Sequence, residues 1–206
     1  MATRPTPHFS GVVEGIVDEA VVRRLLDHVG AGVGDIHVKN GKPQIVTSLP
    51  GFIAAAKYSP WLVVVDLDGD APCAPAFLRT LPAAVPGLLL RVAVREIEAW
   101  ILGDRERIAE FLGISIGHIP RDPDSIADPK ETLVALARRS RRKDIREDIV
   151  PRIGSGRRVG PAYGSRVIEF VRDTADGWRP DRAAGDSVSL ARCLAALRAI
   201  HRRAVK

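Results

Sequence analysis

The chain has 206 residues, the length of one domain with at most a small appendage. Hydrophobic residues make up 46% and charged residues 27%, which is ample for a core and ordinary for a globular protein. No apolar run approaches the ~18 residues of a membrane helix, and the first ten residues lack the apolar segment of a signal peptide. Two isolated cysteines, Cys73 and Cys193, and scattered histidines exclude a disulfide framework and the usual zinc spacings, and they predict a reducing cytoplasm.

The charge is divided unevenly along the chain. Residues 1–129 carry 12 Lys and Arg against 16 Asp and Glu, a balance of −4. Residues 130–206 carry 19 against 9, a balance of +10, which gives the overall +6. An acidic part joined to a basic part is expected where a polyanion is held near carboxylates. An Arg-rich helical surface that only aids solubility would give the same pattern.

The first half of the chain alternates between strand and helix patterns. This alternation predicts an α/β fold with a mostly parallel sheet flanked by helices. The predicted order is strand, helix, extended segment with a turn at Asn40–Gly41, helix, strand, helix, strand and a helix or helix pair, at residues 8–15, 17–30, 35–46, 49–58, 61–68, 73–85, 87–94 and 96–113.

The pattern changes in the second half. A loop rich in Pro and Asp leads into basic helical segments that are separated by a glycine-rich basic loop. We therefore expect an α/β core over residues 1–112 and a basic helical extension over residues 113–206 that packs on it. The expected helices cover residues 130–150, 167–175 and 187–206, and the glycine-rich loop covers residues 154–166.

The segment "WLVVVDLDGD", residues 61–70, delivers three carboxylates to the end of a buried strand. Ligands of open α/β sheets bind outside the carboxyl ends of the strands, where Asp66 and Asp68 lie. On an extended backbone these two residues project to the same side, with Cα atoms ~6.5–7 Å apart. Carboxylates at that reach can bind a hard cation such as Mg²⁺. Gly69 lets the chain turn away, and Asp70 is either a third ligand or a helix N-cap.

Glu14 ends the first predicted strand, in "VVEGIVDE". Asp18 and Glu19 fall in the first turn of the following helix, where acids interact favourably with the helix dipole. That explanation does not suit Glu14, because Glu14 precedes the turn at Gly15. We expect Glu14 at the same sheet edge as Asp66.

These features resemble the TOPRIM domain, which occurs in topoisomerases, primases and nucleases of the overcoming-lysogenisation-defect type. The resemblance covers about residues 8–100 and rests on "VEG" at a strand end, an acid four residues later and a later strand that closes on Asp-x-Asp. The segment "VREIEAWILGD" followed by "DPK" resembles an uncharacterised bacterial family of TOPRIM-like proteins over most of the chain. Neither tyrosine has the context of a topoisomerase nucleophile, and no zinc module of a primase precedes the core.

The resemblance implies a nuclease that hydrolyses phosphodiester bonds with Mg²⁺ or Mn²⁺, one or two ions. Glu14, Asp66 and Asp68 would be the catalytic metal-site residues, and Asp18 would join them as in the overcoming-lysogenisation-defect branch. It also implies a role in phage defence beside a separate ATPase, because this chain has no P-loop.

A second group of candidates follows the last predicted strand. Glu98 in "VREIEAW" is a natural further metal ligand and Glu96 a weaker one, although both also suit a helix N-terminus. We expect Trp100 in the core. Lys130 in "DPK" could balance transition-state charge, or it could simply start a helix that is capped by Asp128.

The basic runs "RRSRRK" and "GSGRRVG" are candidates for contacts with the phosphates of DNA or RNA. The sequence leaves open whether the chain forms a homodimer. The candidate nucleic-acid-binding residues are Lys130, Arg138, Arg139, Arg141, Arg142, Lys143, Arg157 and Arg158.

Two other functions also suit the sequence. The fold could be a non-catalytic, metal-stabilised binding subunit that senses a partner. Alternatively, "VVVDLDGD" resembles the motif of haloacid-dehalogenase-type phosphatases, with Asp66 as the nucleophile and Asp68 as the acid/base. That family needs a further pair of aspartates on a late strand, and residues 130–206 predict no such strand.

Overall fold

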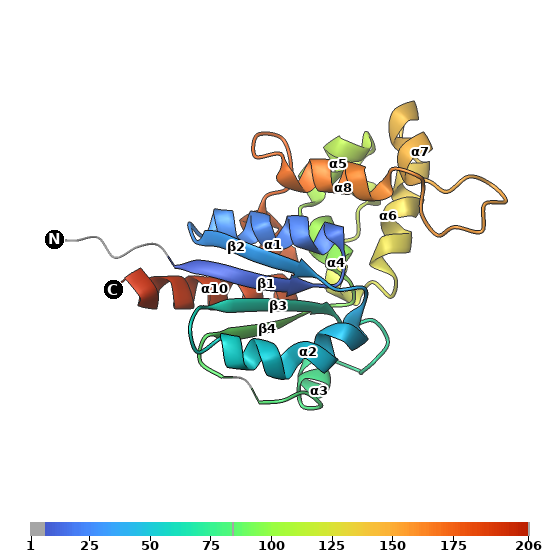
Figure 1. Ribbon diagram of the computed structural model, residues 1–206. Coiled ribbons are helices and arrows are strands. Elements are labelled where there is room, and N and C mark those ends of the chain that lie inside the picture. Colours follow the sequence, from blue (N-terminus) through green and yellow to red (C-terminus); the bar gives the residue numbers. More distant parts are fainter. Residues whose placement is uncertain (1–6, 84, 206) are drawn as a thin grey trace.

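The computed structural model describes residues 7–83 and 85–205. The chain forms an α/β fold around a four-stranded sheet in which all strands are parallel and the order is β2-β1-β3-β4. Helices cover both faces of the sheet (Figure 1). The expected fold class is confirmed, and the arrangement is consistent with a TOPRIM-like fold. The strands are β1 (His8–Val13), β2 (Gly32–Val38), β3 (Trp61–Asp66) and β4 (Leu88–Ala93).

Ten α-helices and two short 3₁₀ turns accompany the strands in the described part of the chain. None of these helices combines the length and the apolar character needed to cross a membrane. The helices are α1 (Ile16–His28), α2 (Lys42–Ala55), α3 (Ala74–Leu78), α4 (Ile97–Leu102), α5 (Arg105–Leu112), α6 (Pro129–Arg138), α7 (Lys143–Ile149), α8 (Tyr163–Arg172), α9 (Pro180–Asp186) and α10 (Val188–Val205).

The buried strand β3 supplies side chains to both faces of the sheet. Leu62 and Val64 belong to the core cluster that contains α1, α4 and the C-terminal helices. Val63 and Val65 belong to a second cluster with α2 and α3. Because side chains alternate along a strand, Asp66 continues the series of Leu62 and Val64 and points to the α1 side.

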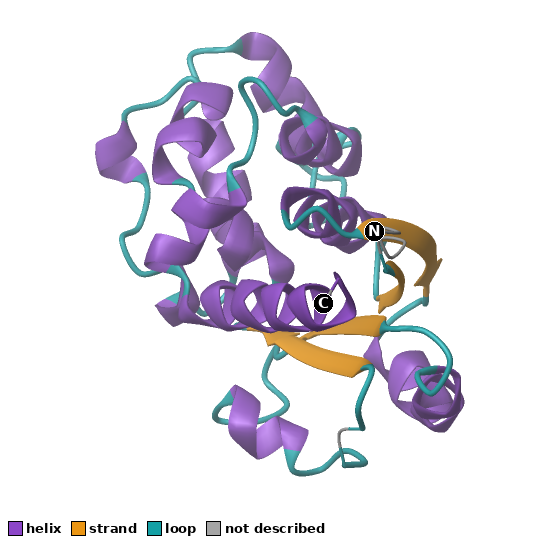
Figure 2. Cartoon of the chain, turned by 90° about the vertical axis from the view of Figure 1, so that its left-hand side faces the viewer, coloured by secondary structure: helices purple, strands orange, loops and turns teal. Residues whose placement is uncertain are grey.

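The C-terminal helices share the core of the sheet. Trp178, Leu190 and Cys193 lie in the same buried cluster as Phe9 of β1 and Leu62 of β3. Figure 2 shows these helices gathered on one side of the sheet. Trp100 is fully buried in this cluster, as expected for a core residue.

The segment 35–46 differs from the prediction. It was expected to be extended apart from a turn at Asn40–Gly41, but strand β2 ends at Val38 and helix α2 begins at Lys42. Gly41 has a φ of 97°, which lets the chain turn sharply, and Pro43 occupies the first turn of α2, where its fixed φ favours a helix. The predicted helix therefore begins earlier than expected.

Other predicted helices are shorter or divided. The segment 73–85 forms a helix only at α3, whereas 96–113 forms the helices α4 and α5, as the prediction of a helix pair allowed. The segment 130–150 divides into α6 and α7. Helix α9 lies in a stretch where no helix was predicted.

Asp104 joins the C-terminal part to α5. Its side chain is 2% exposed and accepts hydrogen bonds from the Arg179 backbone N–H at 2.9 Å and from Arg179 Nη2 at 2.7 Å. It also caps α5 by accepting from the Arg107 N–H. One buried carboxylate thus holds together α5 and the residue preceding α9.

Replacing this carboxylate should therefore destabilise the fold. We expect Asp104→Ala to lower the free energy of unfolding by about 1–3 kcal/mol, because the Arg179 N–H and the partly exposed Arg179 guanidinium lose a buried acceptor and α5 loses its cap. Chemical denaturation would measure this change in the free energy of unfolding, and Asp186→Ala, at an exposed position, is the control. Equal stability of the two variants would contradict this role.

Candidate functional site: a carboxylate cluster at the sheet edge

The carboxyl ends of β1 and β3 form the switch point of the sheet. After β1 the chain passes to β2 on one side, and β3 then lies on the other side of β1. Connections that diverge from two neighbouring strands leave a crevice where ligands of such folds bind. Glu14 follows β1 and Asp66 ends β3, and the Asp66 N–H donates to Glu14 Oε1 at 3.0 Å.

Two helices add acids to this point. Asp18 lies in the first turn of α1 and Glu98 in the first turn of α4. Asp18, Asp66 and Glu98 are 8%, 9% and 1% exposed. We call Glu14, Asp18, Asp66 and Glu98 the carboxylate cluster.

Burial and mutual repulsion shift the protonation of the cluster. Burial, followed by the charges of Glu98 and Glu14, raises the pKa of Asp18 to about 7. Burial and the charges of Asp18 and Glu98 raise the pKa of Asp66 well above its ordinary value. Ionised together, these carboxylates repel each other in a poorly hydrated site.

Two carboxylate oxygens of the cluster have no hydrogen-bond partner among the described residues. Asp66 Oδ1 and Glu98 Oε2 are both buried. Buried oxygens of this kind are uncommon and costly, so each one calls for a ligand or a functional reason. The other oxygen, Glu98 Oε1, accepts from the Tyr163 hydroxyl at 2.9 Å.

Lys130 brings positive charge to the cluster. Its Nζ lies 3.5 Å from Glu98 Oε1 and 3.8 Å from Glu96 Oε1. Burial lowers the pKa of Lys130, but the charges of Glu98 and Glu96 outweigh it and raise the pKa overall. Glu96 Oε2 accepts the Lys130 backbone N–H at 2.8 Å, so Glu96 serves the start of α6.

The cluster suits a divalent cation in its chemistry. All its donors are carboxylate oxygens, which Mg²⁺ and Mn²⁺ prefer, and two of them are free. In the described residues, however, no three Asp, Glu, His or Cys side chains converge closely enough to hold a metal ion as they stand. Side-chain rotation would have to bring the donors together.

Asp68 and Asp70 lie apart from the cluster, bound to Lys42. Lys42 Nζ is 2.7 Å from Asp68 Oδ2 and 2.6 Å from Asp70 Oδ2, and Lys42 is 7% exposed. Strand β3 ends at Asp66, and Asp68 has a φ of 49°, so the backbone is no longer extended there. Asp66 and Asp68 therefore do not form the side-by-side pair expected from an extended strand.

Lys42 was not among the predicted site residues. Burial lowers its pKa, but hydrogen bonds with Asp68 and Asp70 raise it overall, so Lys42 remains a cation. A signal was present in the sequence, because Lys42 directly follows the turn at Asn40–Gly41. Recognising it required knowing that α2 starts there.

The eight predicted basic residues separate into two groups. Lys130, Arg138, Arg157 and Arg158 line one pocket of about 230 Å³. The others lie outside that pocket: Arg139 bonds to His118, Arg142 pairs with Asp144, Lys143 pairs with Glu147, and Arg141 is exposed.

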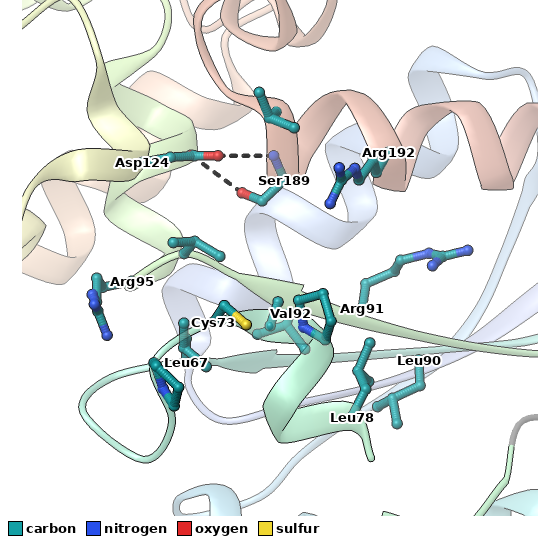
Figure 3. A pocket seen from close by; sticks show the side chains of 15 residues that line it. Leu67, Cys73, Leu78, Leu90, Arg91, Val92, Arg95, Asp124, Ser189 and Arg192 are labelled. Carbon is teal, nitrogen blue, oxygen red and sulfur yellow. Dashed lines mark hydrogen bonds between the residues drawn. The ribbon is translucent and has the colours of Figure 1, made fainter.

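A different cavity, of about 310 Å³, lies between α3, β4 and α10 (Figure 3). Asp124 accepts there from the Ser189 N–H and hydroxyl. The cavity lining includes none of the clustered carboxylates. Its Arg95 donates to the Asp68 carbonyl at 2.9 Å and thereby supports the loop after β3.

The chain matches no model of a known protein family, no curated protein and no solved structure. The resemblance to TOPRIM-like proteins therefore remains a prediction from the sequence. Only the geometry described above bears on the function.

The raised pKa of Asp18 predicts a pH-dependent stability. Below about pH 4 the carboxyl is protonated in both the folded and the unfolded chain, so it contributes no difference. As pH rises from about 4 to about 7, the unfolded chain ionises first, and the folded state loses stability. Asp18→Asn should therefore become more stable than the wild type by about 3 kcal/mol at pH 8, but not at pH 4.

Chemical denaturation from pH 4 to pH 8.5, without divalent cations, would measure this difference. The exposed Asp35→Asn in β2 is the matched control and should show none. A difference between Asp18→Asn and the wild type that does not change with pH would contradict the prediction.

Proposed function

We propose that the protein is a divalent-metal-dependent nuclease that hydrolyses phosphodiester bonds at the carboxylate cluster. The observation that carries this proposal is the pair of buried, unpartnered oxygens, Asp66 Oδ1 and Glu98 Oε2, at the switch point of the sheet. Carboxylate oxygens that are kept away from water and from donors destabilise the fold, and a cation that binds them would remove this free-energy cost.

The residues of the chain would divide the work. Glu14, Asp18, Asp66 and Glu98 would hold one or two Mg²⁺ or Mn²⁺ ions, which supply positive charge for the attacking and leaving oxygens of a phosphodiester. The Asp66 N–H fixes Glu14, and the Tyr163 hydroxyl fixes Glu98.

Lys130 would serve the substrate. It stays charged beside Glu98 and is partly exposed, with 33% of its side chain open to solvent. A cation in this position can contact a phosphate and stabilise the charge that develops on it.

The sequence pattern predicts Asp68 as a catalytic metal-site residue, but in this proposal Asp68 does not bind the metal directly. Its charge acts on Asp66, whose pKa it raises, while its carboxylate is bonded to Lys42. It would become a ligand only after leaving Lys42. The phosphatase alternative needs Asp68 as the acid/base beside Asp66, and the bond to Lys42 weakens that alternative.

A non-catalytic, metal-stabilised subunit is the remaining alternative, since it would use the same cluster to bind ions. Under either function, a role in phage defence beside a separate ATPase stays part of the proposal. The two functions differ in whether nucleic acid is turned over.

Cleavage assays test the nuclease. With Mn²⁺ or Mg²⁺ the wild type should nick or degrade DNA or RNA, and Asp66→Asn and Glu98→Gln should each lose roughly 100-fold, about 3 kcal/mol of transition-state stabilisation. Asp35→Asn is the control and should retain full activity. Cleavage that persists in both cluster variants would exclude this site.

Thermal unfolding tests the ions alone. Mn²⁺ in excess should raise the Tm of the wild type, because an ion that binds only the folded state stabilises it by mass action. The same addition should leave the Tm of Asp66→Asn nearly unchanged. A rise in Tm without any cleavage would favour the non-catalytic subunit, and no rise in the wild type would contradict both functions.

A further inference from the structure

One face of α6 forms the wall of a basic groove. Lys130, Val134 and Arg138 follow one another at helical spacing along this face. The opposite wall consists of Pro151, Arg157 and Arg158, from the loop between α7 and α8. Since α6 rises 1.5 Å per residue, Lys130 and Arg138 are about 12 Å apart along its axis.

The groove is linked to the carboxylate cluster through Lys130 and continues past the end of α6. Lys130, at one end, is also the lysine that faces Glu98. Arg138 and Pro151, at the other end, also line a second pocket of about 680 Å³ that contains Arg146 and Arg152. We call the two pockets together the basic track; its cations are Lys130, Arg138, Arg146, Arg152, Arg157 and Arg158.

Several guanidinium groups of the track are free to bind an anion. Within the described part of the chain, Arg138, Arg152 and Arg157 have no carboxylate oxygen within 4.0 Å. Two of the three acids that line the track are already engaged, since Glu147 pairs with Lys143 and Asp148 with Arg166; Glu131 is the third.

We propose that the basic track binds one strand of nucleic acid by its phosphates and leads it to the carboxylate cluster. This inference rests on the proposed function, of which it specifies the substrate class: single-stranded DNA or RNA. A pocket of about 230 Å³ between a helix and a loop is far smaller than the body of a duplex, so we expect only a single sugar-phosphate backbone to enter it.

The lining predicts how the strand is recognised. Apart from the cations and the three acids, the lining of the two pockets is apolar and includes Val134, Ala135 and Pro151. Among the described residues no aromatic ring or amide side chain lines either pocket. Contacts would therefore go to phosphates, which gives weak sequence preference and strong salt dependence. The fully exposed Ile153 lines the second pocket and offers an apolar surface to an unstacked base.

Fluorescence anisotropy without divalent cations tests the track separately from hydrolysis. The probes are a labelled single-stranded dT 12-mer, a U 12-mer and a 12-base-pair duplex, each titrated at several salt concentrations. We expect both single strands to bind at least about tenfold more tightly than the duplex.

Removal of two cations gives a quantitative second test. The double variant Arg138→Ala/Arg157→Ala should bind the single strands about tenfold more weakly. Its slope of log affinity against log salt should fall in magnitude by about 1.4, or about 0.7 for each lost phosphate contact. The control is Arg79→Ala, an exposed arginine at the end of α3 on the other face of the sheet, and it should change neither quantity.

The outcomes separate the track from the nuclease. Single-strand binding that depends on Arg138 and Arg157 supports the track even if no cleavage occurs, in which case the nuclease proposal fails alone. Duplex binding as tight as single-strand binding overturns the track, and so does an unchanged salt slope in the double variant. Cleavage that depends on the cluster would still uphold the nuclease in either case.

Discussion

The site depends on the repulsion among carboxylates that the fold gathers in one poorly hydrated place. Asp66 and Glu98 are almost completely buried, and each keeps one oxygen without a donor among the described residues. The free-energy cost of ionising these buried carboxylates appears as raised pKa values of Asp18 and Asp66. The fold limits this cost with three donors, the Asp66 N–H, the Tyr163 hydroxyl and the Lys130 ammonium group.

Two of these three donors come from the C-terminal part. Lys130 lies in the first turn of α6 and Tyr163 is the first residue of α8, whereas the acids lie at the ends of β1 and β3 and in the first turns of α1 and α4. The shared hydrophobic core explains how this is possible, since α8 packs against α1 and α10 against β4. The acidic and basic halves of the sequence are therefore complementary, and the site is complete only where they meet.

The sequence was informative where the backbone is regular. Glu14 and Asp66 end parallel strands, so the sheet edge could be predicted to bring them together, and Asp18 and Glu98 follow from the first turns of the adjoining helices. Asp68 could not be placed in this way. Asp68 lies beyond the end of β3 with a φ of 49°, so the strand pattern does not fix the direction of its side chain. Its partner is Lys42, and Lys42 is placed beside it because α2 begins there.

The basic residues show the same limit. Arg138 and Arg139 are neighbours in sequence, yet only Arg138 faces the groove, because successive residues on a helix point about 100° apart. Arg157 joins it from a distant loop, which no periodicity could reveal.

The two lysines of the site explain why its acids behave differently. Lys42 binds Asp68 and Asp70 directly, so each carboxylate has a hydrogen-bond donor, and the two share the single charge of Lys42. Lys130 stands farther from Glu98, at 3.5 Å, and within the described part of the chain Asp66 Oδ1 and Glu98 Oε2 have no donor. Carboxylate oxygens thus have donors from Lys42 on one side of the β3 end, and two buried oxygens lack donors on the other side. A cation would bind where buried carboxylate oxygens lack donors, which singles out Asp66 and Glu98 among the acids at this edge of the sheet.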